Sequence, residues 1–480
     1  MRLFTILGLL LFGYSSTQAQ SDSLLTEING NWTLDNCIAY TAAKNLTLAD
    51  QKIFVDMAEN NLKLNKDSRY PTLSASGSHN YNFGRSIDPF SNQFVTRSIQ
   101  SNNFSLTSSV VLYNGNRITN SILRSKNEVE RAKIEEQAQR NQILTNVADA
   151  FLQVILAENQ LKSFTVVNKS TVTQLEQAKK LFEAGATNQQ QYLNLKAQDA
   201  RDQMNIQSAK SSLLLANLRL KQMMQLDSKE FQIVHPSLDE VAPITSWTQD
   251  GIINNALARM SYVKLAEAQV RSAEINIDIS KSAFYPRLAV FGNVNTLYSE
   301  TRLERFNFQK STSPIGYVES TSQPVVTEFT SYETRVSAFG QQLNDNFGQT
   351  VGVSLSVPIF NGNQARSGVR DAKLNAMLRR NNLERIKLEV VADITQAYTQ
   401  YENALVEVES AKANEKAQKE NYDFVLKSAN AGVSTTADMI LALNAWGQAQ
   451  NDLNNAKFKV LYAQITLHFY NTGEISITPY

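Results

Sequence analysis

The sequence predicts a mostly helical chain, built from two copies of one unit, with a β-barrel part to which each chain contributes four strands. Three observations support this fold class. Short motifs recur at constant displacements, proline is missing from two long stretches, and segments of alternating polar and apolar residues lie between those stretches. We therefore expect long helical hairpins where proline is missing and strand pairs between them.

The repeat is visible in four pairs of motifs. Trp-Thr-Leu-Asp at 32–35 recurs as Trp-Thr-Gln-Asp at 247–250, and Tyr70-Pro71 recurs as Tyr285-Pro286, both displaced by 215 positions (247 − 32 and 286 − 71). Tyr-Asn-Gly-Asn at 113–116 recurs as Phe-Asn-Gly-Asn at 360–363, and Ala184-Gly185 recurs as Ala431-Gly432, both displaced by 247 (362 − 115 and 432 − 185). The second copy therefore holds 32 more residues (247 − 215), all in one tolerant loop.

The N-terminus predicts export. A short apolar stretch from Leu3 to Gly13 follows Arg2 and precedes small and polar residues, which is typical of a cleavable secretory signal over 1–19, cut after Ala19. The first repeat then covers 20–236 and the second covers 237–480.

Composition excludes several classes of function. The net charge is +1 and no Lys/Arg-rich block occurs, so nucleic acid is not expected as a partner. Cys37 is the single cysteine and cannot form an internal disulfide; we favour a small buried packing residue over a reactive or metal-binding thiol. The three histidines are far apart, and no catalytic, cofactor-binding or metal-binding motif is present. The sequence therefore predicts neither an enzyme nor a cofactor.

Helices are expected in the two proline-free stretches, 90–235 and 359–478. Residues 116–183 would form a rod of about 100 Å, and 363–430 has the same length. Each rod ends at an Ala-Gly turn, at 184–188 and 431–435, where Gly185 and Gly432 permit the chain to reverse. A returning helix over 188–226 follows the first turn, and a single helix over 34–69 precedes the first strand.

Strands are expected at about 72–84, 103–113, 287–297 and 349–360. Pro71 and Pro286 mark where the first strand of each pair begins, and Gly115 and Gly362 mark where the second ends. Each strand has about the length that crosses an outer membrane at a tilt. The connecting loops, about 85–102 and 298–348, are predicted to be exposed to solvent outside the cell.

Four strands cannot close a barrel, since about eight are needed. Open sheet edges are not tolerated in a membrane, so the remaining strands must come from other copies of the chain. We therefore expect an obligate oligomer.

These features resemble the outer-membrane efflux protein family, the TolC-like export ducts of Gram-negative bacteria. The resemblance rests on the duplicated order of strands and helices, the Tyr-Pro and Asn-Gly boundaries and the two Ala-Gly turns. It implies a homotrimer in the outer membrane with a twelve-stranded barrel and a periplasmic helical tunnel. It also implies a periplasmic adaptor that docks at the helical tip and an inner-membrane pump that supplies energy.

Three tip residues have roles implied by this resemblance. Gly185 and Gly432 would lie where the adaptor docks, although their role as turn residues stands without it. Asp438 lies six residues beyond Gly432 and matches one acidic position of the family's periplasmic gate, whereas the next expected acid is Leu441. The alternative for Asp438 is an aspartate at a helix start, where the helix dipole favours a negative charge.

Two other functions remain open. A soluble periplasmic coiled-coil adaptor or structural rod would explain the signal segment and the helical hairpins, but not the amphipathic strands with aromatic residues near their ends. An exported enzyme is disfavoured because no acid, base, nucleophile or ligand set is clustered in the sequence.

Overall fold

A computed structural model describes residues 31–87, 92–96, 98–227, 231–234, 247–431 and 433–475. The predicted signal segment, 1–19, lies outside the described residues. The helices are α2 (Leu34–Lys44), α3 (Leu46–Asp67), α4 (Arg117–Glu183), α5 (Gln189–Met224), α6 (Gln249–Arg259), α7 (Ser261–Lys281), α8 (Phe339–Asp345), α9 (Gln364–Asn430) and α10 (Thr436–Thr472). The strands are β1 (Asn31–Trp32), β2 (Thr72–Asn82), β3 (Arg85–Ile87), β4 (Phe94–Thr96), β5 (Ile99–Asn114), β6 (Gln232–Ile233), β7 (Arg287–Ser299), β8 (Leu303–Tyr317), β9 (Pro324–Val336) and β10 (Gly348–Ser356).

The chain divides into two compact units, and each unit takes segments from both sequence repeats. The helical unit comprises the described residues of Met1–Glu59, Asn127–Ser272 and Ala376–Tyr480. The strand unit comprises those of Asn60–Lys126 and Ala273–Asn375. The repeats are therefore units of sequence, and compact structure forms only where the two repeats come together.

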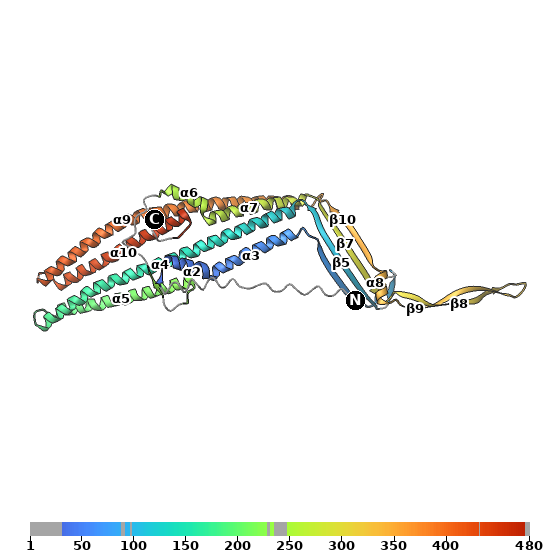
Figure 1. The fold of residues 1–480 in the computed structure, drawn as a ribbon, viewed down its shortest axis with the longest axis horizontal. Coiled ribbons are helices and arrows are strands. Elements are labelled where there is room, and N and C mark those ends of the chain that lie inside the picture. The colour runs from blue at the N-terminus through green and yellow to red at the C-terminus, as the bar shows by residue number, and fades with distance from the viewer. Residues whose placement is uncertain are drawn as a thin grey trace. The chain divides into compact units, whose positions relative to one another are not determined.

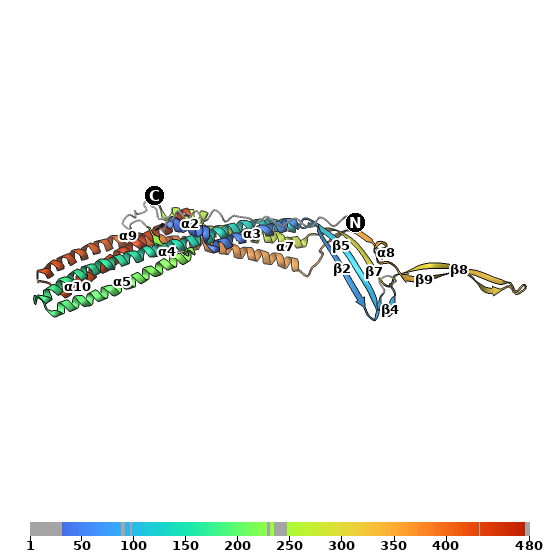
Figure 2. The ribbon, with the colours of Figure 1, turned by 60° about the horizontal axis from the view of Figure 1, so that its bottom comes forward.

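In the helical unit, long helices pair as hairpins. Helix α4 lies beside α5 and α9 lies beside α10, as two views of the ribbon show (Figures 1 and 2). Helices α4 and α9 have 67 residues each, so each extends for about 100 Å. Both begin one residue later than the sequence predicted. No proline lies within either helix, which explains how such long helices persist.

The largest core cluster of the helical unit packs around Phe151 of α4, which is fully buried. Trp32 and Tyr40 meet edge to face there, with ring centroids 5.4 Å apart. Cys37 belongs to the same cluster as a free, fully buried thiol, which confirms the packing role predicted for it. Burial disfavours the thiolate and raises the pKa of Cys37 to about 12.

The single helix predicted over 34–69 is wrong, because the structure divides it into α2 and α3 at Asn45. Asn45 has an extended backbone (φ −68°, ψ 122°), and its Oδ1 accepts a hydrogen bond from the Thr47 amide at 2.9 Å. Gln225 Oε1 accepts another from the Leu46 amide at 2.9 Å. The break recurs 215 residues later at Met260, between α6 and α7. Neither break contains a proline or a glycine. The break at Asn45 is instead stabilised by the side-chain hydrogen bonds of Asn45 and Gln225.

The strand unit contains a four-stranded antiparallel sheet in the order β10-β7-β5-β2 (Figure 1). Strands β2 and β5 come from the first repeat, β7 and β10 from the second, and the β5–β7 pairing joins the repeats. The structure shows four strands near the four predicted positions, with different ends. Strand β5 begins at Ile99 rather than 103, and β10 ends at Ser356 rather than 360. Pro358 follows β10 closely and has no amide hydrogen to donate to a ladder.

The segment 298–348 was predicted to be a loop, and that prediction is wrong because the segment contains two strands and a helix. Strands β8 and β9 pair with each other as a separate two-stranded ribbon, and the short helix α8 follows. The polar composition of the segment concealed a run rich in β-branched and aromatic strand-forming residues, from Val325 to Tyr332.

Candidate functional site

The four-stranded sheet has two chemically different faces. Residues paired across antiparallel strands point to the same side of a sheet, so the register assigns each residue to a face. The apolar face combines these residues from the four strands: Leu73, Ala75, Tyr81, Phe104, Leu106, Val110, Leu288, Val290, Val294, Tyr298, Val351, Val353 and Leu355. It is open to the surroundings, since the side chains of Leu73 and Val351 are 70% and 85% exposed. Such an exposed apolar surface indicates a hydrophobic partner.

The opposite face carries mostly small hydroxyl and amide side chains, together with a few apolar residues such as Phe291 and Leu297. Ser76 and Ser105 share a hydrogen bond of 2.7 Å between their hydroxyl groups, and Asn293 Nδ2 donates to Thr107 Oγ1 at 3.3 Å. Arg287, at the first position of β7, is the one charged residue in the four paired strands. The sheet therefore has one apolar face and one mostly polar face that is uncharged beyond Arg287. Such a sheet is suited to separate lipid from water.

Both outer edges of this sheet lack a partner strand among the described residues. Strand β2 pairs only with β5, and β10 pairs only with β7. Unpaired edges leave backbone N–H and C=O groups available to another strand.

The register repeats between the two halves. Ser76 pairs with Ser105 in the first repeat, and Phe291 pairs with Gly352 in the second. The first residues of these pairs are displaced by 215 (291 − 76) and the second by 247 (352 − 105), the two displacements found between the sequence motifs. The ring of Phe291 covers Gly352, because a Cβ added there would lie 2.6 Å from Phe291 Cζ.

The Asn-Gly boundaries contain two consecutive left-handed residues in each repeat. Gly115 and Asn116 have φ of 64° and 63°, and Gly362 and Asn363 have φ of 62° and 65°. Glycine and asparagine are the residues that tolerate this conformation best, which explains why both repeats have Gly-Asn at this position. Pro71 and Pro286 lie at the other boundary. Each directly precedes the first residue of a strand, β2 and β7 respectively.

The predicted turn at 184–188 is present between α4 and α5. Gly185 has φ of 72°, and the amide of Ala186 donates to the Leu181 carbonyl at 2.8 Å, which closes the end of α4. Asn188 then caps α5 by accepting a hydrogen bond from the Gln191 amide at 3.0 Å. Gly432, the counterpart in the second repeat, lies outside the described residues.

Asp438 lies in the first turn of α10 and forms a capping box with Thr435. Its Oδ2 accepts hydrogen bonds from the Thr435 amide at 3.0 Å and from the Thr435 hydroxyl at 2.6 Å. The Asp438 amide in turn donates to Thr435 Oγ1 at 3.1 Å. These bonds to the carboxylate lower the pKa of Asp438. Asp438 thus occupies the helix-start position considered in the sequence, while its side chain remains exposed to solvent.

Two further observations concern metal ligands and membrane-spanning helices. Within the described part of the chain, no group of three or more His, Cys, Asp or Glu residues is arranged to hold a metal ion. No helix among the described residues combines the length and apolar content needed to cross a bilayer.

Sequence reasoning missed helix α8 and the residue that anchors it. Gln342 is fully buried; its Oε1 accepts a hydrogen bond from the Ser299 amide at 3.0 Å, and its Nε2 donates to the Ser337 carbonyl at 2.9 Å. Helix α8 is thereby fixed to the end of β7. A seven-residue helix has too few turns to show helical periodicity, so no sequence signal could have identified it.

Comparison with known proteins identifies relatives named as secretion and outer membrane proteins. The chain is 22% identical over 345 residues to the alkaline protease secretion protein AprF of Pseudomonas aeruginosa, an alignment that covers 70% of this chain and 62% of AprF. It is 21% identical over 359 residues to the outer membrane protein TolC of Vibrio cholerae, which covers 72% of this chain and 70% of that protein. The chain thus spans less than two thirds of AprF.

Solved structures show the same fold. The outer-membrane channel OprN matches with a TM-score of 0.71 at 15% identity, over 92% of this chain and 89% of OprN. The outer membrane protein VceC of Vibrio cholerae matches with a TM-score of 0.69 at 13% identity, over 90% and 95% of the two chains.

Both repeats match a single family description, "Outer membrane efflux protein", over residues 38–224 and 252–471. These ranges include most of the chain and almost all of its long helices. The match confirms the family resemblance and the outer-membrane location that the sequence predicted. The chain belongs to the outer membrane efflux protein family.

Proposed function

We propose that three copies of this chain form a passive exit duct in the outer membrane. The observation that carries the proposal is the sheet with one apolar face, one neutral polar face and two open edges. Three sets of four strands would close a twelve-stranded barrel with the apolar face toward lipid and the polar face toward the lumen. The helical hairpins would continue the duct through the periplasm, and the connections at the far strand ends, including β8 and β9, would face outside the cell.

An incomplete contact supports closure between copies. Within the chain, Gly115 of the first repeat packs against Tyr285 of the second. Shifting these residues by the repeat displacements gives Gly362 and Tyr70. Gly362 has no described atom within 4 Å of the position of a Cβ, and Tyr70 is 69% exposed. The missing contact would form if Gly362 of one copy met Tyr70 of the next.

The same argument predicts the register between copies. Thr107 of β5 pairs with Asn293 of β7. Applying the displacements of 247 and 215 places Ser354 of β10 (107 + 247) opposite Ser78 of β2 in the neighbouring copy (293 − 215). Both serines lie on the polar face of their own strands, as a shared lumen wall requires.

Crosslinking tests this proposal. The double variant S78C/S354C should form disulfides between copies, because cross-strand Cα atoms lie about 4.5–5.5 Å apart, within disulfide range. Covalent trimers should therefore appear on denaturing gels. The control H79C/S354C differs by one residue and places the two thiols on opposite faces, so it should crosslink poorly. Cys37 is buried and contributes little background.

Monomeric protein, or equal crosslinking of both double variants, would contradict a barrel closed in this register. Cell fractionation adds a coarser test of the alternative. Recovery from the soluble periplasm without detergent would favour a soluble adaptor or structural rod.

We further propose that the duct works with an inner-membrane pump and a periplasmic adaptor that docks at the turns containing Gly185 and Gly432. The family membership supports this arrangement, as does the exposure of apolar residues near the turns, such as Val433 at 81% and Leu181 at 43%. Cysteines introduced beside Gly185 should crosslink to the adaptor in intact cells. No adaptor product from any position around either turn would argue against docking there.

A further inference from the structure

The strand unit carries a strong local excess of positive charge where its helices join the sheet. We define the basic collar as the charged residues of four segments, 60–71, 114–126, 273–287 and 357–375. Its basic residues are Lys63, Lys66, Arg69, Arg117, Arg124, Lys126, Lys281, Arg287, Arg366, Arg370 and Lys373. Its acidic residues are Asp67, Glu274, Asp278 and Asp371. The collar therefore has a net charge of +7 (11 − 4), whereas the whole chain has +1.

These basic side chains are available for binding. All eleven are exposed. Lys281 forms an ion pair with Asp278 at 2.8 Å, and Arg124 donates to Asn276 Oδ1 at 3.2 Å. The other nine form no ion pair with any residue that the structure describes. So many uncompensated like charges repel one another and favour an anionic partner.

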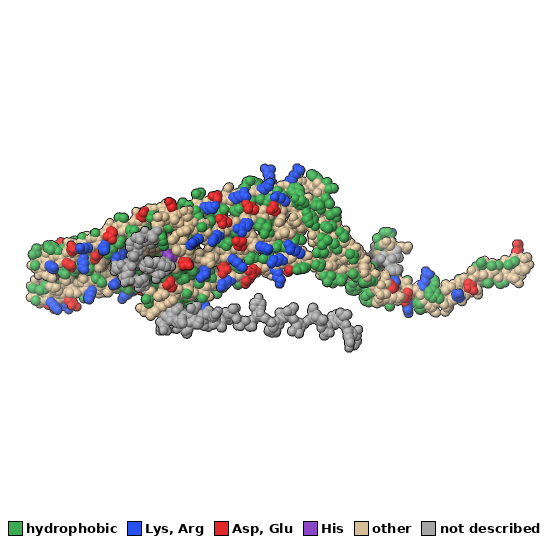
Figure 3. All heavy atoms as spheres, turned by 45° about the horizontal axis from the view of Figure 1, so that its top comes forward, with side chains coloured by type: hydrophobic (Ala, Val, Ile, Leu, Met, Phe, Trp, Pro, Cys, Tyr) green, Lys and Arg blue, Asp and Glu red, His purple; other side chains and the backbone are tan. Residues whose placement is uncertain are grey.

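The collar adjoins the apolar surface of the sheet. Arg287 is bonded to Leu288 of the apolar face, and Arg69 precedes Leu73 by four residues. On the way from β10 to α9 the chain exposes Ile359 at 96% and Phe360 at 81% before it reaches Arg366. Figure 3 shows Lys and Arg side chains beside the hydrophobic surface at which the strands begin.

The charge distribution matches the profile of a membrane boundary. The four paired strands contain a single charged residue, Arg287, at the collar end of β7. Positive charge then rises within the first helical turns. Lys and Arg residues near a bilayer surface are attracted to anionic headgroups, and the attraction falls off within a Debye length of about 8 Å.

We propose that the basic collar binds the phosphate groups of anionic phospholipids in the leaflet of the outer membrane that faces the periplasm. This inference rests on the proposed function, which places the sheet in that membrane. An alternative use of the charge would be attraction of anions into the duct. The lipid is favoured because the polar face of the sheet, which would line the duct, is neutral beyond Arg287.

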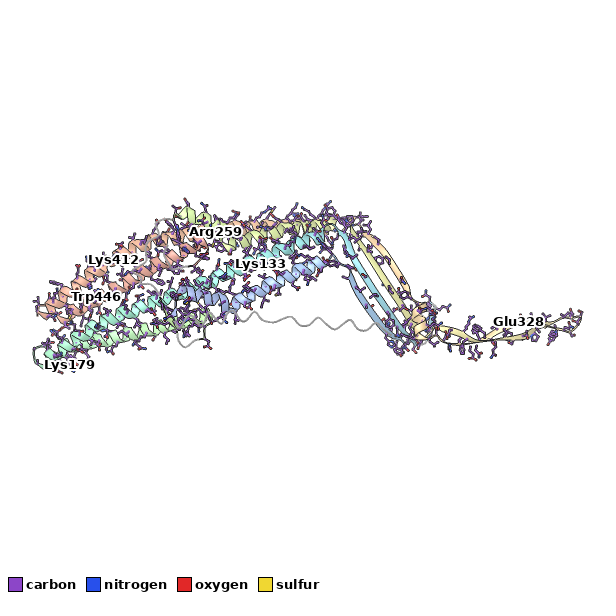
Figure 4. The ribbon with its side chains drawn as sticks, viewed as in Figure 1. Lys133, Lys179, Arg259, Glu328, Lys412 and Trp446 are labelled. Carbon is purple, nitrogen blue, oxygen red and sulfur yellow. The ribbon has the colours of Figure 1, made fainter. Side chains whose placement is uncertain are left out.

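The test uses the full chain purified in an uncharged detergent and titrated with phosphatidylglycerol or with phosphatidylcholine, with bound lipid measured by native mass spectrometry. The variant R366Q/R370Q/K373Q removes three collar charges from exposed positions of α9 while keeping side chains that favour a helix. The control K412Q/K416Q/K419Q removes three exposed lysines about 70 Å farther along α9. Lys412 is labelled in Figure 4.

We expect the wild type to prefer phosphatidylglycerol and to lose that preference as salt is raised. The collar variant should bind phosphatidylglycerol roughly tenfold more weakly or worse, with phosphatidylcholine binding unchanged. The control variant should match the wild type. Equal affinity of the wild type for both lipids, or equal losses in the two variants, would overturn the proposal.

Two parallel measurements separate this proposal from the proposed duct. Light scattering of the same samples reports the oligomeric state, so a monomer that still prefers anionic lipid would refute the duct and leave the collar intact. Reversal potentials in planar bilayers report ion selectivity. A collar variant with a changed anion preference and unchanged lipid binding would show that these residues line the lumen, and would refute the lipid site.

Discussion

Gly115 packs so closely against Tyr285 that no side chain fits between the two residues. A Cβ added to Gly115 would lie 2.7 Å from the Cβ of Tyr285 and 2.9 Å from the Ser282 carbonyl oxygen. Both neighbours are fixed parts of the chain rather than the ends of flexible side chains. The contact joins the end of the first repeat's strand pair to the beginning of the second's, so it sets where the two repeats meet.

Gly115→Ala should therefore destabilise the protein substantially. The left-handed φ of 64° and the two close contacts both oppose a methyl group, and we expect a loss of about 2–4 kcal/mol in the free energy of unfolding. Guanidinium unfolding of the detergent-solubilised protein measures it.

The comparison variant is Gly362→Ala, which has the same backbone strain but meets no described atom. Within an isolated chain it should cost only about 1–2 kcal/mol. In the proposed trimer it should also displace Tyr70 of the next copy and reduce the trimer fraction. If both variants lower the free energy of unfolding of the monomer equally, the close contact at Gly115 does not contribute to stability.

Cys37 should make stability fall in alkaline solution. Burial raises its pKa to about 12, above the value of about 8.5 for an unfolded thiol. In the interval between these values the folded state holds a proton that the unfolded state has lost, so the free energy of unfolding decreases as pH rises from about 8.5 to 12. Below about pH 8.5 both states are protonated and the effect vanishes.

Thiol alkylation measures the same property directly. At pH 8.5 the folded protein should react with iodoacetamide roughly a thousandfold more slowly than after unfolding, because the thiolate is the reactive species. Cys37→Ala should remove this thiol's part of the alkaline slope. Rapid labelling of the folded protein would show that Cys37 is not shielded.

Asp438 caps α10, and the family resemblance also implies a gate charge at this position; substitutions can separate the two. Asp438→Asn keeps a side-chain oxygen for the Thr435 bonds but removes the charge, whereas Asp438→Ala removes both. If the charge guards the periplasmic entrance, both variants should raise single-channel conductance in planar bilayers. If Asp438 only caps α10, the conductance of both should equal that of the wild type, and Ala should lower the Tm more than Asn.

Acid should weaken the Asp438 cap. Its pKa is lowered in the folded state, so the stabilising contribution is complete above the unfolded pKa of about 3.9 and is lost as pH falls through the folded value. A Tm profile between pH 6 and 2 should show a smaller acid loss for Asp438→Ala than for the wild type. Parallel profiles would indicate that the hydrogen bonds with Thr435 do not form in solution.

The ribbon of β8 and β9 should be dispensable for the sheet. The Ser337 amide donates to the Arg302 carbonyl at 2.9 Å, so the two ends of the ribbon already meet, and Arg302 is held by Asp345 at 2.6 Å. Glu328 lies out on the ribbon (Figure 4). Replacing 303–336 by two glycines should preserve S78C/S354C crosslinking and change Tm little. Loss of crosslinked trimers would show that the ribbon takes part in assembly.

Much of the architecture could be predicted from local sequence. Missing proline marked α4 and α9, glycine and asparagine marked the boundaries at 115 and 362, and Gly185 marked the first tip turn. These features depend on the conformational range of single residues and on periodicity along one segment. The displacements of 215 and 247 also predict the repeated register. Strands that begin and end at equivalent motifs pair equivalent residues in the two repeats.

Other features required residues that are distant in the sequence. The break at Asn45 depends on Gln225, whose Oε1 accepts a hydrogen bond from the Leu46 amide 179 positions away (225 − 46). Helix α8 depends on the end of β7, and the ribbon depends on pairing between two segments that read as polar loop. The sequence by itself determined the long helices, the four sheet strands and the positions of the main turns, since those choices follow from local backbone and side-chain sterics. Only the tertiary structure decided which strands are neighbours, which edges stay open and which charges gather at one level, because these depend on contacts whose free energy appears only when remote segments meet.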